Sequence, residues 1–151
     1  MAYQGILPLF RATMSADATN VTGNGTGYVI AANTETYDVT SEYDNATFIF
    51  TPKSAGKYHF DVTVFAYGFV APTDTVDLFI ANSAGTAIGY LTRVSGTTAI
   101  GGNLCLTCSA NLLMAANDTA KVIYKVLGEG ADIIDIQSGT AFTSFSGYKV
   151  G

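Results

Sequence analysis

Residues 54–68 read SAGKYHFDVTVFAYG, and the alternation of this stretch predicts a long β-strand. Successive side chains of a strand point to opposite faces of its sheet. One face then begins polar at Lys57 and ends aromatic at Phe65 and Tyr67. The other face holds only apolar groups, as the inside of a β-sandwich does: Tyr58, Phe60, Val62, Val64 and Ala66. Because a monomeric sandwich keeps its outer face polar, the aromatic end of the first face needs a cover.

Two kinds of cover satisfy this requirement. A second subunit would bury the aromatic end, which makes Phe65, Tyr67 and Phe69 candidates for a contact between subunits. A loop of the same chain would bury it as well. The pattern alone leaves both open.

The rest of the chain continues in short alternating runs separated by turns rich in Gly, Asn, Ser and Asp. Helical periodicity is nearly absent, and even SANLLMAAND at 109–118 continues an alternating run into the turn pair Asn117-Asp118. Nine or ten short strands at this spacing predict a single all-β sandwich or barrel. The expected strands span residues 6–14, 27–31, 46–51, 57–69, 74–82, 86–94, 103–115, 119–127 and 140–150.

The composition narrows the partners of this domain. Hydrophobic residues make up 48% of the 151 residues and charged residues only 13%, which indicates that an oligomer covers part of the surface. Seven basic residues are scattered among twelve acidic ones, so neither nucleic acid nor a membrane surface is expected as a partner. The N-terminus lacks the basic start and long apolar run of a secretory signal, so we expect synthesis in a cytoplasm.

Few residues invite a chemical role. The single histidine, His59, shares its face with Asp61, but no nucleophile or second acid joins them in a recognisable motif, so no enzyme is expected. Cys105 and Cys108 form C-x-x-C, yet zinc needs four ligands, and a strand points these two side chains to opposite faces. We expect Cys108 in the core, Cys105 on the other face, and His59 as a partly exposed strand residue.

The order of short motifs resembles the complement C1q-type globular head, a branch of the tumour-necrosis-factor-like jelly rolls. The segment 37–66 carries the central motif: Tyr37-Asp38, Phe48, Phe50, Pro52 and Gly56-x-Tyr58-x-Phe60. That family usually has proline directly before the glycine, whereas Pro52 stands four residues earlier. Downstream, LLMAANDTAKVIY resembles a Leu-rich strand, turn and strand of the family, and TSFSGYKV resembles its last strand, with Phe145, Gly147 and Tyr148.

The resemblance implies a ten-stranded jelly-roll sandwich that assembles as a homotrimer. The domain would span residues 1–151, with 1–6 as a candidate N-terminal arm. Tyr148 then joins the three aromatic residues named above as a candidate for the trimer interface. The residues that define the fold motif are Gly56, Tyr58, Phe60, Phe145 and Gly147.

No cofactor is expected, although calcium stays open. Some C1q-type heads resemble calcium binders, and this chain has two D-x-x-D pairs, Asp74/Asp77 and Asp132/Asp135. Neither pair has the D-x-D-x-D-G pattern of a calcium loop, so no ligand positions can be matched.

Two functions follow as expectations. The first is a non-enzymatic structural protein of a virus particle, such as a bacteriophage, that binds the major capsid protein on the virion surface and stabilises the shell. This capsid decoration or cement role rests on a head-like domain that starts at its own Met, without the collagen stalk or signal of secreted relatives. The alternative is an extracellular receptor- or glycan-binding knob of a fibre, or a bacterial surface C1q-like module.

Overall fold

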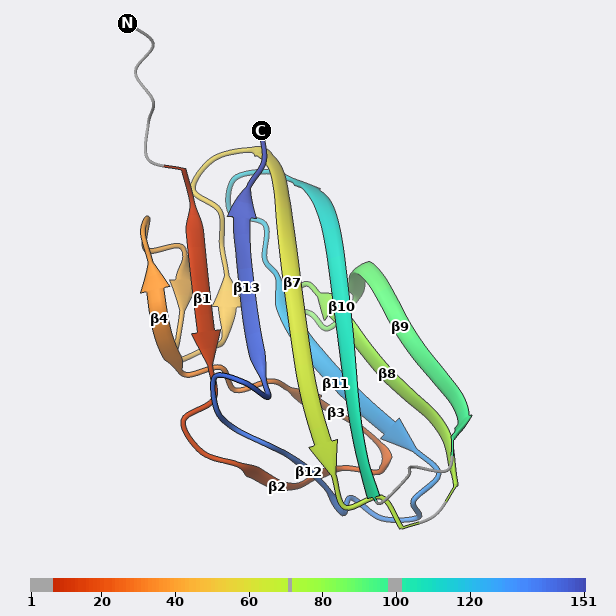
Figure 1. The fold of residues 1–151 in the computed structure, drawn as a ribbon. Coiled ribbons are helices and arrows are strands. Elements are labelled where there is room, and N and C mark those ends of the chain that lie inside the picture. Colours follow the sequence, from red (N-terminus) through yellow and green to blue (C-terminus); the bar gives the residue numbers. More distant parts are fainter. Residues whose placement is uncertain (1–6, 71, 98–101) are drawn as a thin grey trace, which may run out of the picture.

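The computed structural model describes residues 7–70, 72–97 and 102–151. Within them the chain forms two facing β-sheets with a core between, and a third sheet of two short strands (Figure 1). None of the described residues forms a helix long and apolar enough to cross a membrane. The strands are β1 (Leu9–Thr13), β2 (Ala18–Thr22), β3 (Asn24–Val29), β4 (Thr34–Asp38), β5 (Tyr43–Asp44), β6 (Ile49–Phe50), β7 (Gly56–Tyr67), β8 (Thr73–Ala81), β9 (Ala87–Thr97), β10 (Asn103–Met114), β11 (Lys121–Leu127), β12 (Ile134–Ile136) and β13 (Ser144–Lys149).

The larger sheet is built around β7. This strand pairs with β10 along one edge, and with β13 and then β12 along the other. Strands β1 and β4 extend the sheet beyond β13, while β2 pairs with β12. The smaller sheet runs β11–β8–β9, and β3 lies beside β11, where Ile30 N donates to Val122 O at 3.0 Å. These two layers form the jelly-roll sandwich that the sequence predicts.

The sequence locates the long strands better than the short ones. Six expected spans coincide closely with β7 to β11 and β13. The expected strand at 46–51 is wrong in its first half, because Asp44 accepts hydrogen bonds from Ala46 N and Thr47 N in a turn and only Ile49–Phe50 pair. Strands β2, β4 and β12 were not expected, and β4 is an edge strand whose first four residues are all exposed, so it shows no alternation.

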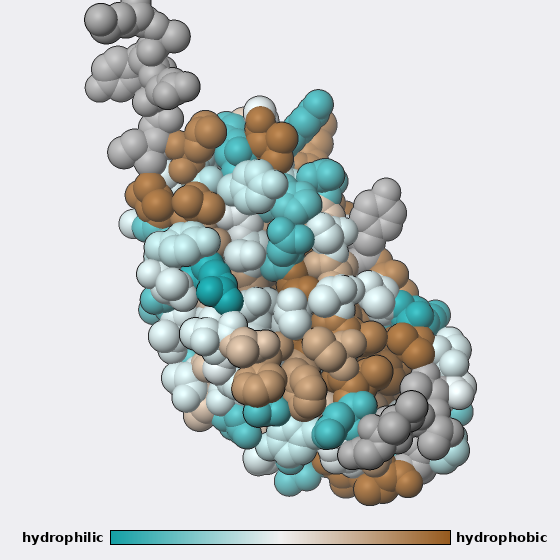
Figure 2. All heavy atoms as spheres, viewed as in Figure 1, coloured by the Kyte–Doolittle hydropathy of each residue, from teal (hydrophilic) through white to brown (hydrophobic). Residues whose placement is uncertain are grey.

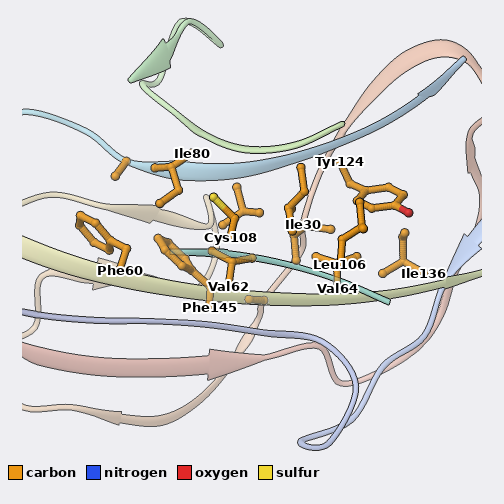
Figure 3. Packing of buried hydrophobic residues seen from close by; sticks show 14 of the residues in the cluster. Ile30, Phe60, Val62, Val64, Ile80, Leu106, Cys108, Tyr124, Ile136 and Phe145 are labelled. Carbon is orange, nitrogen blue, oxygen red and sulfur yellow. The ribbon is translucent and has the colours of Figure 1, made fainter. Parts of the chain in front are cut away.

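The alternation of β7 is confirmed. Its apolar face is almost fully buried, with Tyr58, Phe60 and Val64 each at 0% exposure. Figure 3 shows Phe60, Val62 and Val64 on one side of the core, with Ile80 and Tyr124 of the smaller sheet on the other. Cys108 also points into this core, as its strand phase predicts.

The end of the core nearest the C-terminus is an aromatic cluster. The Phe10 ring lies 4.9 Å from Tyr43, 5.0 Å from Phe50 and 4.9 Å from Phe145, centroid to centroid. The Tyr43 hydroxyl donates to Ala32 O at 2.8 Å, and burial raises its pKa. Tyr43 is therefore a core residue, whereas Asp44 next to it is exposed. The predicted pair, Tyr37-Asp38, lies on β4, where the Tyr37 ring is exposed.

The fold motif lies in and around this cluster. Tyr58, Phe60 and Phe145 are core residues, and Gly147 sits where a side chain would collide with Phe60 and Phe10. Gly56 begins β7 beside the Lys149 side chain.

Phe69 is a core residue, so its assignment to the subunit interface is wrong. Strand β7 ends at Tyr67, and Gly68 follows with a φ of 92°, a conformation that glycine adopts without strain. This turn breaks the alternation and sends the Phe69 ring inward, where it is only 7% exposed.

Candidate subunit interface

The outward face of the large sheet is the candidate site, formed by β1, β13, β7 and β10 (Figure 1). Their register aligns side chains in rows across the strands. One row is Leu9, Tyr148, His59 and Asn111, and the next is Arg11, Ser146, Asp61 and Ser109. The charged residues among the outward positions of these strands are Arg11, Lys57 and Asp61. We call this surface the sheet face.

Phe65 forms an aromatic pair with Phe142 on the sheet face. The segment 137–143 crosses the face between β12 and β13, anchored where Gln137 N donates to Phe65 O at 2.9 Å and Phe65 N donates to Thr143 Oγ1 at 3.3 Å. It places the Phe142 ring 5.5 Å from the Phe65 ring, edge to face. A loop of the same chain therefore covers part of Phe65, but Phe142 itself stays 38% exposed. Tan and brown apolar atoms gather across the lower half of this view (Figure 2).

Tyr67 is held by its own chain. Its hydroxyl donates to Asp17 Oδ2 at 3.0 Å, while Ser138 N and Oγ donate to Asp17 Oδ1 at 2.7 Å each. The hydrogen bond from the backbone N–H of Ser138 lowers the pKa of Asp17 most, and the bond from the Ser138 hydroxyl lowers it further. Desolvation and the bond to Asp17 raise the pKa of Tyr67. Tyr67 thus holds the segment before β2 in place. Its side chain is less exposed than that of Tyr148, so less of its surface is available to a partner subunit.

Tyr148 is the most exposed of the predicted interface residues. Its side chain is 45% exposed on β13, beside Leu9 of β1 at 39%. On the other side its ring centroid lies 5.1 Å from the imidazole of His59. These three residues form an apolar and aromatic shelf at the end of the sheet face nearest the C-terminus.

The contacts of His59 do not form a catalytic triad. Asp61 Oδ2 and Ser109 Oγ both approach Nε2, at 3.0 and 3.3 Å, while Nδ1 lies 2.8 Å from Asn111 Oδ1. A serine–histidine–aspartate triad needs its hydroxyl and carboxylate on different ring nitrogens. His59 instead joins the centre of the sheet to its edge strand.

The cysteines and carboxylates show no assembled metal site. Cys105 is exposed, Cys108 is buried, and the two are not bonded to each other. The described part of the chain contains no group of three or more His, Cys, Asp or Glu placed to hold a metal ion. Asp132 accepts from Asn24 N at 2.9 Å and Thr26 Oγ1 at 2.7 Å, and these bonds lower its pKa. Asp77 likewise pairs with Arg93 and Asp135 accepts from Asn20 N, so these three carboxylates of the D-x-x-D pairs bind groups of their own chain.

Comparison with solved structures identifies this architecture. No protein-family model matches the sequence, and no curated protein is a significant sequence match. The globular domain of zebrafish complement 1qA superposes with a TM-score of 0.59 at 14% identity, covering 95% of this chain and 98% of that one. Murine APRIL superposes with TM-scores of 0.69 at pH 8.0 and 0.66 at pH 5.0, at 7% identity, covering 96% of this chain and 100% of that one. The chain has the C1q- and tumour-necrosis-factor-like jelly-roll fold.

Within this jelly roll, two exposed apolar residues of the large sheet and its connecting segment, Phe142 and Leu113, were not among the predicted interface residues. Phe142 falls in the expected strand at 140–150 but lies in the segment before β13, which packs onto Phe65. Leu113 is 82% exposed on β10. Alternation already placed Leu113 in phase with Cys105 on the outward face, so that signal was present in the sequence.

Proposed function

We propose that the chain is a non-enzymatic subunit of a homotrimer and that this trimer decorates the outer surface of a virus capsid. The observation that carries the trimer is the sheet face, where aromatic and small polar side chains outnumber the charges of Arg11, Lys57 and Asp61. The cores of protein interfaces are depleted of charge and enriched in aromatic residues. The resemblance to C1q-type heads and tumour-necrosis-factor-like jelly rolls likewise implies a homotrimer.

The decoration role rests on surface chemistry and symmetry. A closed threefold module suits threefold positions of a shell, and its contacts with the major capsid protein would bury apolar area. Residues 1–6, the candidate arm, lie outside the described residues. A receptor- or glycan-binding knob would instead group exposed aromatic residues on the loops of one end. In the described ranges the exposed aromatic residues, Tyr37, Phe142 and Tyr148, lie on the edge and face of the large sheet and do not group on the loops of one end, which counts against the knob.

The trimer is tested by light scattering. We expect a mass three times 15.8 kDa, and Phe142→Asp should shift the mass toward one subunit because it places a charge inside the interface. Leu127→Asp is the matched control, since Leu127 is similarly exposed, at 39%, but lies on the smaller sheet. A single-subunit mass for the wild-type chain at micromolar concentration would overturn the trimer.

The decoration role is tested with capsids that lack this protein. Purified capsids should retain the added trimer through sedimentation and withstand heating to a higher temperature than bare capsids. Capsids that neither retain the protein nor gain stability would contradict the role. Binding to a glycan array or to cells in that case would support the knob instead.

A further inference from the structure

Two turns face each other at the end of the sandwich that carries the C-terminus. Residues 82–86 join β8 to β9, and residues 115–120 join β10 to β11. Ser83 N donates to Thr119 Oγ1 at 2.8 Å, and Lys121 Nζ donates to Ser83 O at 2.9 Å. A hollow of about 360 Å³ lies between the two turns and is lined by residues of both. Because these hydrogen bonds tie the turns together, the walls of the hollow are preorganised for a ligand.

Two polar side chains of this hollow have one atom of their end group fixed and the other free. Asn82 Oδ1 accepts from Thr86 N at 3.0 Å, so its carboxamide keeps Nδ2 as a donor. Asp118 Oδ2 accepts from Ala115 N at 2.7 Å, which leaves Oδ1 as an acceptor. Neither Asn82 Nδ2 nor Asp118 Oδ1 is hydrogen-bonded to any residue that the structure describes. The hollow thus offers an oriented donor and an oriented acceptor.

Asn117 joins this hollow to a second one. The second hollow, of about 310 Å³, lies over the β5–β6 hairpin and is lined by Asn117 together with Pro52 and Lys53. Asn117 adopts a φ of 71°, and its N donates to Pro52 O at 2.8 Å. Its carboxamide bonds to no residue in the described part of the chain, so a donor and an acceptor stay available where the two hollows meet. We call the two hollows with Asn117 between them the end groove.

The charges around the end groove argue against an anionic ligand. Of the described residues that line it, Lys53 alone is basic, and its Nζ donates to Thr40 O. Glu42 Oε1 accepts from Lys53 N at 2.7 Å, and Glu42 Oε2 accepts from Thr40 Oγ1 at 2.9 Å. The free charged oxygens belong to Asp118 and Asp44, each of which bonds to backbone through its other oxygen. An anionic ligand would therefore meet repulsion and no available cation.

A pair of neighbouring hydroxyl groups matches the free groups of the end groove. Each hydroxyl both donates and accepts, so one can donate to Asp118 Oδ1 while the next accepts from Asn82 Nδ2. Hydrogen bonds to a carboxylate are among the strong ones. A cationic ligand would face unpaired amide donors, and extended peptides commonly bind the free backbone of an edge strand instead of turn side chains. Ile88 and Leu112, which also line the first hollow, suit the C–H face of a sugar ring.

We propose that the end groove binds a neutral oligosaccharide, with one sugar unit in each hollow and Asn117 between them. Volumes of about 360 and about 310 Å³ are at the lower limit of small-molecule sites, which suits single sugar rings. The site recognises hydroxyl groups through turn side chains and not through grouped aromatic rings, so it differs from the knob considered above. The inference goes beyond the proposed function, because neither trimer formation nor capsid binding requires a sugar.

Three substitutions test the end groove while preserving its turns. Asn117→Gly removes the carboxamide, and glycine keeps the left-handed backbone. Asn82→Asp and Asp118→Asn keep the oxygen that accepts from the backbone, but each reverses the hydrogen-bonding role of the free atom. Asn20→Gly is the matched control, because Asn20 is exposed and has a φ of 55°. It lies on β2, which joins the large sheet through β12 at the far end of β7.

Binding is measured in two steps. The wild-type chain is applied to an array of neutral and acidic oligosaccharides, with an array of random peptides in parallel. The neutral trisaccharide that binds most strongly is then titrated in solution by calorimetry, because a trimer would raise the apparent affinity on an array. Each of the three groove variants should weaken binding of that trisaccharide about tenfold or more, whereas Asn20→Gly should not. Light scattering should give every variant the mass of the wild type.

The outcomes separate this site from the trimer. A neutral trisaccharide that binds the wild type and the control but not the three groove variants supports the site, whatever the oligomeric mass. An array on which no neutral oligosaccharide binds, or on which only acidic sugars or peptides bind, overturns it. Equal affinity of the wild type and Asn117→Gly also overturns it. Neither of these negative results bears on the trimer.

Discussion

Replacing Gly147 by alanine should destabilise the fold, because this glycine lies under two rings. It occupies β13 between Phe10 on β1 and Phe60 on β7 in the sheet register. A Cβ atom at this position would lie 2.6 Å from Phe60 Cδ1 and 2.8 Å from Phe10 Cε1. Carbon atoms in contact prefer about 3.5–4.0 Å, so the rings would have to move by about 1 Å.

The rings have little room to move. Phe10 is stacked on Tyr43 at 4.9 Å and on Phe50 at 5.0 Å, and Phe60 packs against Phe50 at 5.3 Å. Forcing an extra carbon into a packed core costs about 1–3 kcal/mol. Alanine restricts the unfolded chain more than glycine does, which returns about 0.4–1 kcal/mol. The free energy of unfolding should therefore fall by about 1–2 kcal/mol.

Urea unfolding followed by circular dichroism measures this change. Wild type and variant are compared at one protein concentration, because assembly shifts apparent stability with concentration. The control is Gly27→Ala on β3, where the nearest heavy atom to a new Cβ, Ile123 Cγ2, lies 3.4 Å away in ordinary contact. Gly27→Ala should leave the stability unchanged or raise it by up to about 1 kcal/mol. A Gly147→Ala protein as stable as wild type would refute the packing argument.

Three further predictions concern other parts of the chain. Phe69→Ala should lower the free energy of unfolding by about 3–5 kcal/mol while light scattering finds the assembly state unchanged; dissociation at unchanged stability would restore Phe69 to the interface. The donors that bond to Asp17 and Asp132 lower both carboxyl pKa values, so these groups stabilise the fold above their ordinary pKa of 3.8 and lose that effect as the pH falls below it. The urea midpoint should thus drop between about pH 5 and about pH 3, and it should drop less in the Asp17→Asn, Asp132→Asn double variant; an equal drop would show that these bonds contribute nothing. A maleimide should modify Cys105 in folded, dissociated subunits and reach Cys108, whose pKa burial raises, only on unfolding; equal rates would contradict the strand phase of the pair.

The sequence predicted the strands that have a long alternating pattern. It did not predict the short strands, whose positions depend on individual turns and side-chain contacts. In β7 and β10 an apolar residue at every second position indicates which face of the strand is buried, so the burial of Phe60 and Cys108 was predictable. The hairpin β5–β6 was not, since its two-residue strands depend on the Asp44 turn and on Tyr43 packing under Phe10.

The candidate site shows the same division. Phe65 followed from strand phase and Tyr148 from the resemblance of the last strand, and both lie on the sheet face. Phe69 did not, because a single left-handed glycine, Gly68, reversed the phase that its neighbours set. Phe142 depends on a segment that leaves the sheet between two strands, and no local pattern marks where a chain departs from a ladder and returns to it.

The proposed trimer would account for two features together: the low charge of the chain, and the lack of charged residues on β10, which pairs only with β7 among the described strands. A surface that faces water throughout its life gains solubility from charge, and an edge strand gains protection from lysine or proline. Here the charges are thinned on the sheet face and absent from β10. In the proposed trimer a closed ring would leave no contact surface uncovered, whereas an open chain of the same contacts would continue to add subunits. The lack of charge that would promote aggregation of a monomer would then be compatible with a finite assembly.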